Sequence, residues 1–136
     1  MVEYAGNIVL RALAAFLGIG DRLSRMRKED RIKAAEYLME VSSCILKVAG
    51  ELRLGHAPHQ ACSHLYRYAK HLPEPVERAL GEESKDVLQR VQRVHVTRLS
   101  LKLVMLSEDR APHRELLDME IIGAKLRALA AQMKAS

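Results

Sequence analysis

The side chains most capable of chemistry in this sequence lie close together between positions 56 and 64. They are three histidines and one cysteine: His56, His59, Cys62 and His64. Zinc binds nitrogen and sulfur ligands in a tetrahedron, and His59 and Cys62 lie three residues apart, which places them on one face of a helix. Cys62 also belongs to the apolar positions of that helix, and His64 points about 200° away from it. We therefore expect a buried thiol at a polar helix start, with no metal site formed by His56, His59 and Cys62 and no bound cofactor.

Motifs for catalysis are missing from the sequence. It contains no G-x-S-x-G turn, no glycine loop for phosphate and no H-E-x-x-H pair. The adjacent acids Glu82 and Glu83 open a predicted helix, where negative charge complements the helix dipole. His95 lies between Val94 and Val96, a setting typical of the edge of a core. We predict that the protein is not an enzyme.

The stretch from Glu29 to Leu54 is the element that must position the others. Its apolar and small residues recur at alternating steps of three and four, the spacing that keeps side chains on one helical face. The residues on this face are Ile32, Ala35, Leu38, Ser42, Ile45, Ala49 and Leu52. Further apolar residues widen the face beyond a coiled-coil seam, so we expect a central helix with neighbours on more than one side.

Glycine and proline divide the chain into further helices. We expect helices over residues 2–19, 21–54, 58–72, 75–80, 82–107 and from 112 onward. In the last of these, the side chains expected to point inward are Leu116, Leu117, Met119, Ile122, Leu126, Leu129, Ala130 and Met133. Residues 94–103 partly alternate, which leaves a strand open there, although no other segment offers a pairing partner. The predicted fold is all-α: a single domain over residues 1–136, a small antiparallel bundle of four to five main helices, with residues 1–20 semi-independent.

Composition supports a helical domain with an aliphatic core. Hydrophobic residues make up 49% of the 136 residues, whereas aromatic residues make up 4%, a balance that suits helices packed on helices. Cys44 and Cys62 lie on apolar helical positions and follow no secretory signal, so we expect reduced thiols in a cytoplasmic protein, with a place at the membrane periphery left open. The net charge of +5 permits an acidic partner without requiring one.

Residues 34–73 combine a tyrosine and a cysteine on one helix with a Gly-x-x-Pro-x-x-x-Cys connector and a second helix that ends in Tyr-Ala-x-x-Leu-Pro. The positions concerned are Tyr37, Cys44, Gly55, Pro58, Cys62, Tyr68, Ala69, Leu72 and Pro73. This pattern resembles a helical module of uncharacterised proteins from cyanobacteria and other filamentous bacteria. Because these positions are caps and core residues, the resemblance implies a shared fold over less than a third of the chain and no catalytic residue.

The apolar N-terminal helix is the most informative functional feature. Its apolar run covers about 15 residues, about 22 Å as a helix, which is shorter than the hydrocarbon core of about 30 Å, so we expect no spanning helix. One interpretation is a bundle helix packed over the central helix. The other is a helix that docks on a partner or lies in a membrane interface, helped by the basic run that follows. The candidate interaction residues are Val9, Leu13, Phe16, Leu17, Arg22, Arg25, Arg27 and Lys28.

A second basic group lies in the predicted 82–107 helix, where Arg90, Arg93, Arg98 and Lys102 recur at steps of three to five. Each Lys or Arg contact with a phosphate releases counterions and gives salt-dependent affinity for nucleic acid. A solvated helix face has the same composition, and the aromatic residues that stack on single-stranded bases are few. Arg90 and Arg93 complete the candidate interaction residues.

The function that the sequence favours is a non-enzymatic interaction or adaptor module. We expect it to bind itself, as a homo-oligomer, or another protein through surplus apolar surface on the N-terminal or the final helix. The alternative is a membrane-interface effector that uses residues 2–33 on an anionic lipid surface. A basic nucleic-acid-binding bundle is the second alternative.

Overall fold

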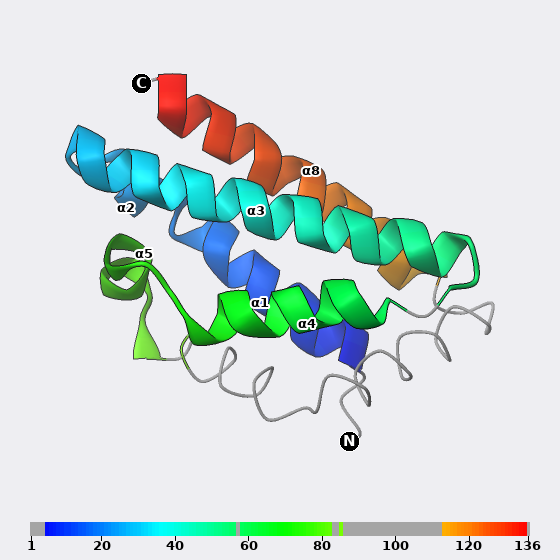
Figure 1. Cartoon of the computed structure of the whole chain (residues 1–136). Coiled ribbons are helices and arrows are strands. Elements are labelled where there is room, and N and C mark those ends of the chain that lie inside the picture. Colours follow the sequence, from blue (N-terminus) through cyan, green and yellow to red (C-terminus); the bar gives the residue numbers. More distant parts are fainter. Residues whose placement is uncertain (1–4, 57, 83–84, 86–112, 136) are drawn as a thin grey trace.

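The computed structural model of the protein describes residues 5–56, 58–82, 85 and 113–135. Its helices are α1 (Ala5–Gly18), α2 (Gly20–Ser24), α3 (Lys28–Arg53), α4 (His59–Lys70), α5 (Glu74–Ala79) and α8 (His113–Ala135) (Figure 1). Four of these helices have 12 or more residues, and the described part of the chain contains no strand. The predicted all-α bundle with four to five main helices is confirmed there. The expected 82–107 helix and the strand alternative at 94–103 lie almost wholly outside the described residues.

Helix α3 is the central element of the bundle, as predicted. It is 26 residues long, it lies across the middle of the molecule, and α2, α4, α5 and α8 all pack against it (Figure 1). Six of the seven residues on its predicted face are buried, and the seventh, Ile32, is half-buried. The one polar residue in the set, Ser42, is fully buried and donates its hydroxyl to the Met39 carbonyl at 2.8 Å, which satisfies the group inside the core.

Gly55 ends α3 in the way the sequence predicts. It has φ of +76°, a conformation that glycine adopts without a steric penalty. Its amide donates to the Leu52 carbonyl at 3.1 Å, and the His56 amide donates to the Glu51 carbonyl at 2.9 Å. These two bonds form a Schellman motif, which satisfies carbonyls left free at the helix end and turns the chain toward α4.

Helices α4 and α8 both run antiparallel to α3. The Cys44 thiol donates to the Ala61 carbonyl at 3.0 Å, and the Tyr37 hydroxyl donates to the Tyr68 carbonyl at 2.5 Å. The later residue of α3 thus contacts the earlier residue of α4, which makes these two helices antiparallel. Two more contacts join α3 to α8. Arg31 donates to the Met133 carbonyl at 3.1 Å near one end, and Arg53 pairs with Glu120 near the other.

The expectation of one continuous helix over residues 21–54 is wrong, because the chain turns at residues 25–27 between α2 and α3. The turn has a packing reason. It lets α2 fold back so that Leu23 is fully buried. It also lets Arg22 donate to the Ala79 carbonyl of α5 at 3.0 Å. A straight helix would carry both side chains along the α3 axis, away from the core.

Candidate functional site

Helix α8 has two apolar faces, and only one of them is packed. The inner face lies against α3 and α1 and consists of Leu116, Met119, Gly123, Leu126, Ala130 and Met133, all buried. The second set, which we name the outer face, consists of Leu117, Ile121, Ala124, Ala128, Ala131 and Ala135, all exposed. Both sets step by three and four along the helix, so each forms a continuous line of apolar side chains. A helix with this pattern can pack on two sides.

The expectation that Leu117 points inward is wrong, because its side chain is 51% exposed. Adjacent residues on a helix point about 100° apart, so Leu116 and Leu117 cannot both face α3, and Leu116 takes the core position. Ile121, one turn further along, is 44% exposed. Among the described residues, only Leu54 is another large hydrophobic side chain with comparable exposure. Contiguous exposed apolar surface of this kind is characteristic of interaction sites.

The outer face is held in place by contacts at both ends and in the middle of α8. Arg53 pairs with Glu120 in the N-terminal half, and Arg31 bonds the Met133 carbonyl in the C-terminal half. At Gly123, a side-chain carbon would lie 3.0 Å from Ile45 and from Leu46, so the two helices approach as closely as glycine allows. Docking on this face therefore does not require α8 to become ordered first.

Charged residues border the outer face in an uneven order. Asp118 and Glu120 lie beside its N-terminal half, whereas Lys125, Arg127 and Lys134 lie beside the middle and the C-terminal half. Two of these residues also bond α3: Glu120 pairs with Arg53, and Arg127 donates to the Ser43 hydroxyl at 3.3 Å. Among the charged side chains that the structure describes on α8, those at one end of the border are thus acidic and those at the other end basic.

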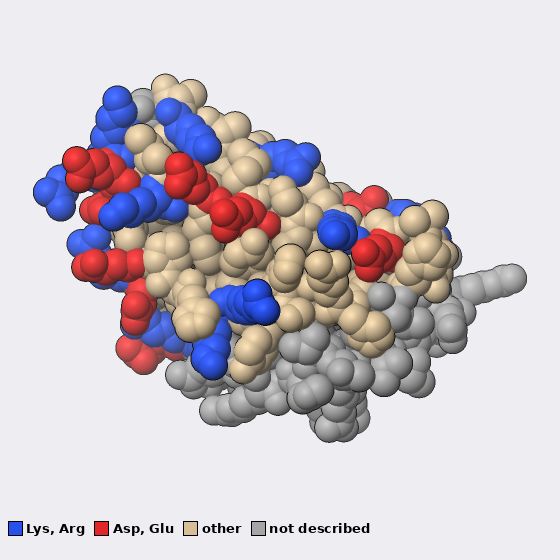
Figure 2. All heavy atoms as spheres, in the orientation of Figure 1, with Lys and Arg blue, Asp and Glu red and all other residues tan. Residues whose placement is uncertain are grey.

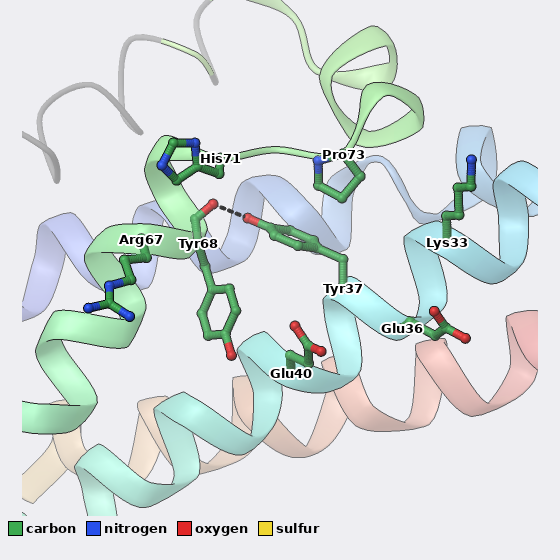
Figure 3. Close-up of a pocket in the computed structure, with 8 residues that line it drawn as sticks. All are labelled: Lys33, Glu36, Tyr37, Glu40, Arg67, Tyr68, His71 and Pro73. Carbon is green, nitrogen blue, oxygen red and sulfur yellow. Dashed lines mark hydrogen bonds between the residues drawn. The ribbon is translucent and has the colours of Figure 1, made fainter.

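A shallow groove between α3 and α4 is the second candidate site (Figure 3). Its volume is about 460 Å³, and it is lined by Lys33, Glu36, Tyr37, Glu40, Arg67, Tyr68, His71 and Pro73. In Figure 3 the Tyr37 hydroxyl points at the Tyr68 backbone, and the Tyr68 ring extends toward the Glu40 side of the groove. A neighbouring hollow of about 270 Å³ shares Glu40 and Tyr68 and reaches Cys44.

Burial raises the pKa values of two tyrosines and two cysteines in and near this groove, so these groups stay uncharged at neutral pH. Burial raises the pKa of Tyr37 and of Tyr68 above the usual tyrosine range, so both phenols stay protonated. Burial also raises the pKa of the Cys44 thiol to about 11 and that of the Cys62 thiol to about 12. A thiol reacts as its thiolate, so these two cysteines are poor nucleophiles at neutral pH.

The candidate metal ligands are not brought together. His56 and His59 are exposed, whereas Cys62 is fully buried between α4 and α3. Among the described residues, no three His, Cys, Asp or Glu side chains lie in a group able to hold a metal ion. Both cysteines are free and buried.

The apolar candidates of the N-terminal helix lie in α1, which packs in the bundle. Leu13 and Phe16 are buried, and Leu17 is half-buried against the core. Phe16 meets the Tyr37 ring edge-on, with ring centres 5.7 Å apart. Val9 also lies in α1, but its side chain is outside the described part. Within the described residues, no helix has the length and hydropathy needed to cross a bilayer.

The basic candidates share their surface with acids. Arg22, Arg25, Arg27 and Lys28 are exposed around the start of α3. Figure 2 shows positive and negative side chains intermixed over this end of the molecule. Arg78 of α5, for example, pairs there with Asp30 at 3.2 Å. Arg90 and Arg93 lie outside the described residues.

No protein-family model, curated protein or solved structure matches this chain. The resemblance over residues 34–73 therefore stays a prediction. The outer face of α8 was accessible to sequence reasoning through its steps of three and four. The sequence does not mark which of the two apolar lines on that helix meets α3.

Proposed function

We propose that this chain is a non-enzymatic helical interaction module that docks on a protein partner through the outer face of α8. The observation that carries the proposal is the second apolar line on that helix. It continues over six positions from Leu117 to Ala135, and all six side chains are exposed. Leu117 and Ile121 are 51% and 44% exposed, so docking would bury about half of each side chain. Full burial of a leucine or isoleucine contributes about 1.5–3 kcal/mol, and about half of that from each of these two residues would supply most of the docking energy.

The described contacts support α8 over the alternatives. A membrane effector would use the apolar residues of α1, yet Leu13 and Phe16 form part of the core. Lipid headgroups and nucleic acid would both need a surface of one sign, yet in the part of the chain that the structure describes, acidic and basic side chains are intermixed around the start of α3 (Figure 2). The high pKa of both thiols supports the non-enzymatic part of the proposal.

Affinity purification followed by reconstitution tests this function. A tagged chain is mixed with an untagged copy and with cell lysate, and each retained protein is purified and titrated against the tagged chain by calorimetry. We expect Ala128→Glu to lose the binding, because it places a charge in the apolar contact. Ala14→Glu makes the same change at an exposed alanine of α1 and should bind as wild type. Equal binding by both variants would refute the proposed role of α8.

A further inference from the structure

We infer that the outer face of α8 pairs with the same face of a second copy of this chain, with the two α8 helices antiparallel about a two-fold axis. The inference rests on the proposed function and names its partner. A two-fold pair brings one surface against itself, so the face must be complementary to itself. Two features of α8 meet that requirement: the order of large and small side chains along the outer face, and the order of acidic and basic side chains along its border.

The size order pairs large side chains with small ones. Both exposed large residues of the outer face, Leu117 and Ile121, lie at its N-terminal end, and the remaining four positions are alanines. An antiparallel pair sets Leu117 opposite Ala135 of the partner subunit and Ile121 opposite Ala131 of the partner subunit. The two helices then keep an even separation along their length. A parallel pair would place leucine on leucine and alanine on alanine, which opens a gap along the alanine half.

The charge order favours the same direction. The acidic end of the border, at Asp118 and Glu120, would lie beside the basic end of the partner's border, at Lys134 of the partner subunit. A parallel pair would bring acid beside acid and base beside base at these two ends. The bases at the middle of the face, Lys125 and Arg127, meet bases in either direction, so they do not distinguish the two arrangements. The helix dipoles also attract when two helices run antiparallel.

The size of the face indicates a reversible dimer. From Leu117 to Ala135 the helix rises about 27 Å, and its width with side chains is about 10 Å. Two such strips bury less than the roughly 1,200 Å² at which stable interfaces begin. We therefore expect an association that is lost on dilution.

Sedimentation equilibrium of the full chain over a concentration series tests the pairing. Wild type and Ala14→Glu should form dimers that dissociate on dilution with equal constants. The double variant Ala124→Glu/Ala128→Glu should weaken the dimer at least about tenfold, with circular dichroism confirming that its helices remain. A wild-type protein that is monomeric at every concentration overturns the inference. If that monomer still binds another protein through α8, the proposed function stands, so the two failures are distinguishable.

Spin labels test the direction of the pair. Lys125 and Lys134 are both exposed, whereas the native cysteines are buried and should not be labelled. In the antiparallel dimer, labels introduced by Lys125→Cys should lie close to each other across the axis. In the same dimer, position 134 of one copy lies opposite position 118 of the other. Labels introduced by Lys134→Cys should therefore lie about 24 Å apart along the helix axis, since 16 residues at about 1.5 Å each separate these two positions. Short distances at both positions would indicate a parallel dimer and overturn the inference.

Discussion

Tyr37 connects three helices through one side chain. Its ring meets Phe16 of α1 edge-on and also meets Tyr68 of α4, with ring centres 6.0 Å apart. Its hydroxyl donates to the Tyr68 carbonyl in the last turn of α4, where carbonyls lack a partner within the helix. The residue thus combines core packing with a cap for the neighbouring helix.

Replacement of Tyr37 by phenylalanine should remove the cap and keep the ring contacts. We expect Tyr37→Phe to lower the free energy of unfolding by about 1 kcal/mol, the usual net contribution of one hydrogen bond, as measured by urea denaturation. Tyr66→Phe removes a hydroxyl from a half-buried ring on α4, near the Lys70 ammonium, and serves as the control. Equal losses in the two variants would show that the Tyr37 bond contributes nothing specific.

The two buried thiols predict a loss of stability at alkaline pH. An unfolded cysteine ionises around pH 9, whereas folding raises the pKa of Cys44 to about 11 and that of Cys62 to about 12. Between pH 9 and 11 the unfolded state therefore binds fewer protons than the folded state, so stability falls as pH rises. Below pH 9 both states keep these thiols protonated, and the thiols add no pH dependence.

Urea denaturation at pH 8 and at pH 10 measures this effect. We expect each thiol to reduce the free energy of unfolding by about 1 kcal/mol over that interval. Cys44→Ala should make the dependence on pH shallower, because an alanine has no proton to lose. A variant that keeps the wild-type slope would contradict the assigned role of the thiol.

At the scale of elements, the contact between α3 and α8 depends on a glycine. A methyl group at Gly123 would lie 3.0 Å from carbons of Ile45 and Leu46, whereas one at Gly50 of α3 would meet no atom within 4 Å. We expect Gly50→Ala to raise the free energy of unfolding by about 0.5–1 kcal/mol, the usual gain in an exposed helix. The free energy of unfolding of Gly123→Ala should be lower than that of Gly50→Ala by about 1 kcal/mol or more, because the extra methyl forces its neighbours apart.

Thermal or urea unfolding of both glycine variants checks this prediction. The two substitutions change the same atoms in helix interiors, so their difference isolates the packing of α8 on α3. Equal gains in the two variants would mean that the helices do not approach as closely as the structure places them.

The sequence predicts most of the helical elements because periodicity and end signals are local properties. The α3 face and the Gly55 cap are both found where expected. The break before α3 was not predictable in this way. Residues 21–33 keep helical spacing throughout, and the turn arises from contacts with α5, such as the bond from Arg22 to the Ala79 carbonyl. Local propensity yields to tertiary packing at such a position.

At the scale of the whole molecule, the candidate site is the apolar surface that stays exposed to solvent once the helices have packed together. The sequence indicates that surplus apolar residues exist on the first and last helices, but burial depends on how all the helices meet. The structure places Leu13 and Phe16 of α1 in the core and leaves Leu117 and Ile121 of α8 exposed. Hydrophobic spacing alone does not predict which line of apolar residues on α8 is buried, because both lines have the same period.

The most direct measurement is the rate at which a thiol reagent labels α8 in isolation and in the presence of a partner. A cysteine introduced by Ala128→Cys lies in the outer face, and one introduced by Ala14→Cys lies on the exposed side of α1. We predict that both react rapidly in dilute purified protein. In concentrated protein or in cell lysate, the thiol at position 128 should react at least about tenfold more slowly, because docking excludes the reagent, while the thiol at position 14 keeps its rate. Unchanged labelling at position 128 under all of these conditions would contradict docking through the outer face of α8.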